Sequence, residues 1–120
     1  MPLKQLGIWD TGVTDLSPLK GMPLEYLHLG GTKVTDVSAL RGMPLNALFL
    51  HGCPDLTDLS PLADCEDLKD ITLPPKAKDY EFLRTFPNLE RIGFVDDSKY
   101  GYRPDRTAAE FWQEYDAGKN

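Results

Sequence analysis

Two histidines and two cysteines have the widest range of possible chemistry in this 120-residue chain. His28 and His51 suggest a metal pair, but no Asp, Glu or Cys at a suitable spacing completes a ligand set. Cys53 and Cys65 are too few to frame a disulfide-stabilised scaffold, and neither has an activating neighbour in sequence. We therefore expect buried, reduced thiols and no metal site. A remaining role for the histidines is pH sensing, because imidazole titrates near neutral pH.

No sequence motif points to catalysis. The chain lacks H-E-x-x-H, C-x-x-C, G-x-S-x-G, a phosphate-binding glycine loop, H-R-D and D-F-G. The acidic pairs in "CED" and "VDD" fall in expected turns, where solvation is the usual role of a carboxylate. We predict a protein that is not an enzyme, with no catalytic residue and no cofactor.

The composition narrows the partners. Thirteen basic residues against nineteen acidic ones give a net charge of -6, which disfavours binding to nucleic acid phosphates. The 41% hydrophobic content is typical of a folded protein, and no apolar run is long enough to cross a membrane. The amino terminus does not read as a signal peptide. We expect a single unit without a membrane span, and a cytoplasmic location.

The elements that would position these residues come from an internal repeat. Five segments align with steps of 21, 21, 23 and 21 residues, beginning at Leu3, Leu24, Leu45, Leu68 and Leu89. Each contains L-x-x-L-x-L or a degenerate form of it, whose alternation is typical of a short strand. A helical turn follows, for which Ser17 or Ser60 is the expected cap and Pro18 or Pro61 the first helical residue. One strand per repeat, all in one direction, predicts a parallel sheet.

The apolar columns of the repeats predict the core. They stack one repeat on the next: Leu6, Ile8, Val13, Leu16 and Leu19 on Leu27, Leu29, Val34, Val37 and Leu40, and these on Leu48, Leu50, Leu56, Leu59 and Leu62. Each side chain is buried only if a neighbouring repeat covers it, so the end repeats need caps.

On these letters the chain resembles the leucine-rich repeat proteins, in particular the short bacterial repeats of 21 to 23 residues found in internalins. The resemblance covers Leu3 to Asp97. It implies an α/β solenoid with a curved parallel sheet on the concave side and short helical or 3-10 turns on the convex side. Where the family usually has Asn after the strand, this chain has Thr11, Thr32, Cys53, Lys76 and Asp97. Lys76 beside two prolines predicts an irregular fourth turn.

The carboxyl end reads as a cap. "TAAEFWQEYDAGKN" has a capping box at Thr107 and Glu110 and an apolar helical face of Ala108, Phe111, Trp112 and Tyr115. We expect this helix to cover Leu89, Ile92 and Phe94; the alternative is an aromatic helix that binds a partner groove. The predicted division is repeats over 1–97, then a loop and capping helix over 98–120. The tail also resembles the ends of larger bacterial repeat proteins, some of which carry a kinase domain upstream.

No cap is predicted at the amino end, because Met1 to Leu3 align with Met22 to Leu24. Two explanations stay open: the chain is the carboxyl-terminal part of a longer array, which we favour, or two copies cover each other in a homodimer. The residues of this self-association surface would be Leu3, Leu6, Ile8 and Leu16.

The outward side chains of the strands form the candidate binding face. Five are aromatic or imidazole rings on adjacent strands: Trp9, Tyr26, His28, Phe49 and His51. Such rings are enriched in binding hot spots, so we predict a protein or peptide partner, with Asp70 and Arg91 setting polarity at the far rim. Gly30 between Trp9 and His51 predicts a notch for a ligand side chain. The alternative is that the rings only stiffen the sheet through cross-strand pairing.

Overall fold

The computed structural model describes residues 4–9, 11–97 and 103–118, and shows one array of stacked repeats. The strands of the array are β1 (Gln5–Gly7), β2 (Tyr26–His28), β3 (Ala47–Phe49), β4 (Asp70–Thr72) and β5 (Arg91–Gly93). The 3-10 helices between them are η1 (Ser17–Leu19), η2 (Ser38–Leu40), η3 (Ser60–Asp64) and η4 (Glu81–Thr85). A short pair, β6 (Asp96–Asp97) and β7 (Arg103–Pro104), precedes helix α1 (Ala108–Ala117).

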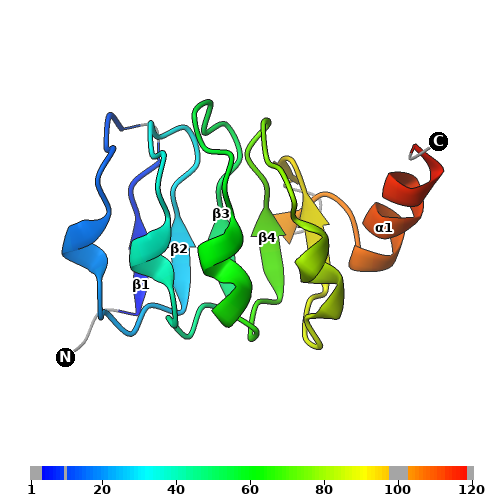
Figure 1. The fold of residues 1–120 in the computed structure, drawn as a ribbon, viewed down its shortest axis with the longest axis horizontal. Coiled ribbons are helices and arrows are strands. Elements are labelled where there is room, and N and C mark those ends of the chain that lie inside the picture. Colours follow the sequence, from blue (N-terminus) through cyan, green and yellow to red (C-terminus); the bar gives the residue numbers. More distant parts are fainter. Residues whose placement is uncertain (1–3, 10, 98–102, 119–120) are drawn as a thin grey trace.

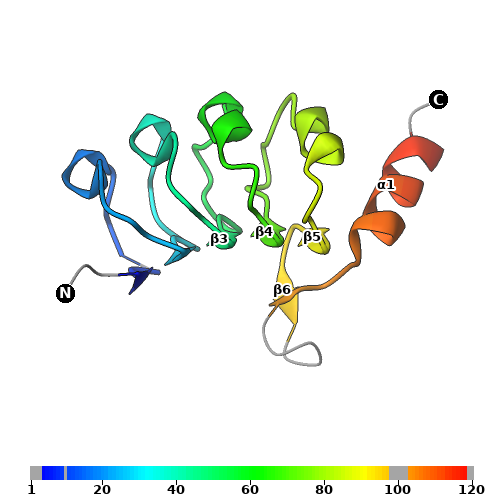
Figure 2. The ribbon, with the colours of Figure 1, turned by 90° about the horizontal axis from the view of Figure 1, so that it is seen from below.

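The five repeat strands form one parallel sheet in the order of the chain (Figure 1). Its central column is Leu6, Leu27, Leu48, Ile71 and Ile92. The 3-10 helices all lie on the opposite side and fan out, so that the strands line the concave side of the arc (Figure 2). The predicted solenoid and its register are confirmed.

The helical turns begin differently from the sequence-based expectation. Each starts at the serine itself, with proline second in η1 and η3. No serine side chain caps the helix; instead an aspartate two residues earlier accepts from the serine backbone N–H, at 2.9 Å for Asp15 and Ser17 and 2.8 Å for Asp36 and Ser38. The carboxylate is the better acceptor because it carries a full charge. The predicted serine cap was wrong.

The column after each strand forms a ladder of short side chains. The hydroxyls of Thr11 and Thr32 each donate to the carbonyl three residues earlier at 2.8 Å, and the Cys53 thiol donates to the Leu29 carbonyl at 3.2 Å. Thr32 is fully buried, so its hydroxyl satisfies a backbone group that water cannot reach. Thr and Cys therefore replace the usual Asn. Both cysteines are buried and free, as expected.

The core runs the length of the array but thins at its start. Leu27, Leu48 and Ile71 are fully buried, whereas Leu6 and Ile8 of the first repeat are half-buried. The fourth turn departs from the others, as predicted: Asp79 has a positive φ of 53°, where Gly31 and Gly52 serve in the second and third repeats. It still leads into η4.

The carboxyl end is more elaborate than the loop and helix expected from the sequence. β6 and β7 form an antiparallel pair, and residues 106–108 then run beside β5, with the Ile92 N–H donating to Arg106 and the Ala108 N–H to Glu90. Helix α1 closes the array beyond β5 (Figure 1). It buries Phe111, and the reciprocal Thr107–Glu110 capping box is present. Within the described residues, no helix is long and apolar enough to span a membrane.

Candidate functional site

The predicted rings come together on the concave face. Their centroids are 5.1 Å apart for Trp9 and His28, 5.1 Å for His28 and Phe49, and 5.4 Å for Tyr26 and Phe49. His51 lies edge-on to His28 at 5.2 Å. We call these five residues the concave aromatic patch. The strand register produces it, because His28 pairs with Phe49 and Tyr26 with Ala47 in adjacent strands.

The members of the patch differ in exposure. Trp9 is 55% exposed, whereas Phe49 is only 3% exposed. Tyr26, His28 and His51 are half-buried. Phe49 is thus the floor of the patch, covered by its neighbours, and Trp9 is its outermost ring.

The notch predicted at Gly30 does not exist. A Cβ at this position would lie 2.7 Å from Cε1 of His28 and 3.0 Å from Nε2 of His51, so the two imidazoles already fill the space. Gly7 is covered in the same way, since its Cβ would lie 2.2 Å from the Trp9 ring. The glycines let rings lie flat against the sheet, which closes the surface instead of hollowing it.

Hydrogen bonds fix the tautomers of both histidines. The Gly30 N–H donates to Nδ1 of His28 at 3.1 Å, so that nitrogen carries no proton. The Thr72 hydroxyl accepts from the N–H groups of Leu50 and His51, at 2.9 and 3.1 Å, and lies 2.9 Å from Nδ1 of His51. With both lone pairs used, this hydroxyl must donate to Nδ1. In this arrangement both imidazoles are neutral and protonated on Nε2.

The two polar residues predicted at the rim are engaged by the chain itself. Arg103 of β7 contacts both carboxylate oxygens of Asp70, at 2.7 to 3.1 Å, and Glu90 at 2.9 Å. The Arg91 guanidinium donates to the Pro104 carbonyl at 2.7 Å. These ion pairs raise the pKa of Arg103. β7 therefore covers the carboxyl-terminal end of the concave face and leaves β1 to β3 as its open part.

The predicted self-association residues also separate. Leu6 and Ile8 are half-buried at the first strand, but Leu16 is only 3% exposed, and Leu3 lies outside the described residues. The described part of the chain contains no group of three or more His, Cys, Asp or Glu side chains placed to hold a metal ion.

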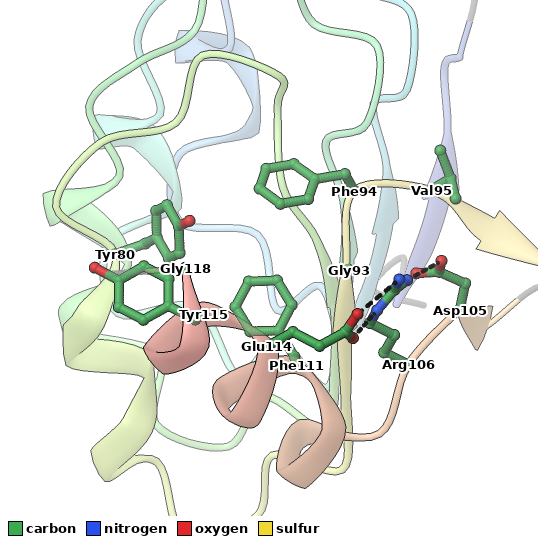
Figure 3. Close-up of a pocket in the computed structure, with 10 residues that line it drawn as sticks. All are labelled: Tyr80, Gly93, Phe94, Val95, Asp105, Arg106, Phe111, Glu114, Tyr115 and Gly118. Carbon is green, nitrogen blue, oxygen red and sulfur yellow. Dashed lines mark hydrogen bonds and ion pairs between the residues drawn. The ribbon is translucent and has the colours of Figure 1, made fainter. Parts of the chain in front are cut away.

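Sequence reasoning missed a groove between β5 and α1, drawn in Figure 3. Its volume is about 480 Å³. The lining is aromatic at one end and charged at the other, and comprises Tyr80, Gly93, Phe94, Val95, Asp105, Arg106, Phe111, Glu114, Tyr115 and Gly118. The exposure of Phe94 (42%) and Val95 (51%) is the trace that the groove leaves on the surface. Sequence could not find it, because Tyr80 and Asp105 belong to separate segments that look like turns.

Comparison with known proteins supports the fold. No protein-family model matches the sequence, and no curated protein does. Among solved structures, internalin C2 from Listeria monocytogenes aligns with a TM-score of 0.67 at 30% identity, over 79% of this chain and 45% of that one. An internalin F from the same species aligns with a TM-score of 0.47 at 25% identity, over 72% of this chain and 34% of that one. This chain thus spans less than half the length of either.

The parallel sheet, the lone 3-10 turns, the terminal helix and this likeness define a leucine-rich repeat protein. Its repeats are of the short kind seen in internalin C2. Such folds are built to present an extended surface to other proteins.

Proposed function

We propose that this chain is a protein-interaction module that binds a partner protein or peptide through the concave aromatic patch. The observation that carries the proposal is the continuous contact of outward-facing rings from Trp9 to His51 across β1 to β3. Inward positions account for apolar residues through the core, but outward positions need another reason, and aromatic rings are enriched in binding hot spots.

The structure narrows the contact residues. Trp9 is more than half exposed and offers the largest apolar area, while the half-buried Tyr26, His28 and His51 add polar atoms around it. Phe49 supports the rings from below. Asp70 and Arg91 were predicted to contact the partner, and any such role would have to compete with Arg103 and Pro104.

The test uses differential capture. Trp9→Ala and His28→Ala should each reduce the recovery of a partner that the wild-type chain retains, by about tenfold or more for a hot-spot ring. Arg41→Ala is the matched control, because it is exposed on the convex side beside η2. The patch is not the site if both ring variants keep every partner that the control keeps. Phe49→Ala is avoided, since it would test folding.

A second candidate function is assembly through the first repeat. The observation that favours it is the contrast between the two ends: residues 106–108 and α1 cover β5, whereas Leu6, Ile8 and Val13 of the first repeat remain half-buried. An apolar edge of this kind favours association.

Light scattering on a size-exclusion column, across a concentration series, tests assembly. Leu6→Glu should convert a dimer to a monomer without loss of helical and strand signal, whereas Val95→Glu, an equally drastic change at the opposite end, should not. A wild-type monomer at all concentrations would exclude this function. A charge at Leu16 is unsuitable because this residue lies in the core.

The remaining expectations are also proposals. We propose that the protein is not an enzyme, binds neither nucleic acid nor membrane, acts in a bacterial cytoplasm and forms the carboxyl-terminal part of a larger repeat protein. The acidic charge supports the second of these. Cell fractionation and the upstream reading frame would test the last two.

A further inference from the structure

The groove between β5 and α1 is an enclosed, amphipathic site that the concave patch does not explain. Tyr80 and Tyr115 lie at one end and Asp105 with Arg106 at the other, while Phe94 and Phe111 face each other between them (Figure 3). The ring centroids of Tyr80, Phe94 and Phe111 are 6.0 to 6.3 Å apart pairwise. A volume of about 480 Å³ is in the range of sites that hold a small ligand or one long side chain.

The charged end has an excess of negative charge. Arg106 lies between two carboxylates: its Nη1 donates to Asp105 at 2.7 Å, and its Nε and Nη2 donate to Glu114. Two carboxylates against one guanidinium leave one negative charge. An anionic ligand would therefore meet net repulsion here, and a cationic one net attraction.

One of these oxygens lacks a donor. Oδ1 of Asp105 is buried and has no hydrogen-bond partner, the only such side-chain atom among the described residues. It lies over β5, where the absence of a side chain at Gly93 makes room: a Cβ there would be 2.1 Å from this oxygen. A buried carboxylate oxygen left unpaired is costly, so a donor at this position would be stabilising.

We propose that the groove binds a lysine side chain of a partner protein. The aliphatic stem would lie along the aromatic rings, and the ammonium group would reach the Asp105 end, where it supplies the missing donor and the balancing charge. A compact ammonium suits a single unpaired oxygen, whereas a guanidinium is matched by two parallel ones, as Arg106 is by Glu114. The inference does not depend on the concave aromatic patch.

The test uses the full chain labelled with nitrogen-15 and three probes: the peptide acetyl-Gly-Gly-Lys-Gly-Gly-amide, the same peptide with norleucine in place of lysine, and n-butylammonium. The lysine peptide should shift the amide signals of Gly93, Asp105 and Gly118, with at least tenfold higher affinity than the norleucine peptide. Asp105→Asn should remove this difference while keeping the size of the side chain. Trp9→Ala should leave it unchanged, which separates this site from the concave patch.

Three results would overturn the proposal. Equal affinity for the lysine and norleucine peptides would show that the groove selects only apolar stems. Binding of n-butylammonium without binding of the lysine peptide would show a site for free amines. Absence of any shift with all probes would show that the groove is closed to them. The peptide comparison is made on the wild-type chain, so it stands even if Asp105→Asn fails to fold.

Discussion

Glycine at outward positions of the strands controls how side chains lie on the concave face. Gly30 is the clearest case, because both imidazoles of the patch occupy the space above it and its own N–H orients one of them. Its backbone is not in the left-handed region, so the constraint is purely one of space.

Gly30→Ala should therefore destabilise the fold by about 1 to 3 kcal/mol, as expected when a methyl group is forced into filled space. Gly12→Ala is the matched control, since a Cβ there meets nothing within 4 Å and its φ is not positive. Urea unfolding of both variants measures the difference. Equal stability of the two would mean that the His28 and His51 rings move aside freely.

The ladder of short side chains allows a second comparison between repeats. Thr32 and Thr11 make the same 2.8 Å bond to a backbone carbonyl, but Thr32 is buried and Thr11 exposed. Thr32→Val should cost about 1 kcal/mol, because the carbonyl loses a donor out of reach of water. Thr11→Val should cost close to nothing. The same loss for both, measured by thermal unfolding, would contradict this view of the ladder.

At the scale of elements, α1 depends on its amino-terminal cap. The Thr107 hydroxyl accepts from the Glu110 N–H at 3.2 Å, and the Glu110 carboxylate accepts from the Thr107 N–H at 2.9 Å. Thr107→Ala should cost about 1 kcal/mol. Ser38→Ala in η2 is the control, because no serine side chain caps that turn. Circular dichroism during urea unfolding would show whether only the first variant is weakened.

Helix-start carboxylates also make stability depend on pH. Hydrogen bonds from Ser17 lower the pKa of Asp15, those from Ser60 lower the pKa of Asp58, and those from Thr107 lower the pKa of Glu110. A lowered folded-state pKa stabilises the fold above the unfolded value, near pH 4, and this contribution is lost as pH falls through the folded value.

Unfolding by urea should therefore require less denaturant at pH 3 than at pH 7. Asp58→Asn keeps an oxygen that can accept from Ser60 but cannot titrate, so its stability should fall less between the two pH values. A wild-type midpoint that does not change with pH would contradict the role assigned to these carboxylates.

At the scale of the whole molecule, the two ends of the array are unequal. The sheet is covered by residues 106–108 and α1 at β5, and the middle strands carry fully buried columns, whereas the first repeat is half-buried. Repeat arrays are stabilised by contacts between neighbours, so a poorly covered end opens first.

Hydrogen exchange should show a gradient along the chain. Amides that join β1 to β2, such as that of Ile8, should exchange faster than those joining β3 to β4, such as that of Leu50. Mass spectrometry of peptic fragments would measure this. Uniform protection would mean that the array unfolds as one unit, or that a second copy covers the first repeat in solution; the light-scattering experiment distinguishes these cases.

The sequence by itself determined the repeat, the direction and register of the five strands, the ring-bearing columns and the capping box of α1. All of these follow from local patterns: each strand carries its own L-x-x-L-x-L, and Thr107 and Glu110 are three residues apart. A pattern that returns every 21 to 23 residues fixes its own alignment, because a slip of one residue would turn the leucines outward.

Only the tertiary structure decided which outward residues remain open. Asp70 and Arg103 are 33 residues apart, and nothing local shows that β7 would cover the far rim. The filling of the space at Gly30, the burial of Phe49 and the groove beneath α1 likewise depend on side chains from different segments meeting in space. Inward positions are specified by the repeat; the surface between the outward ones is set by how those side chains pack together.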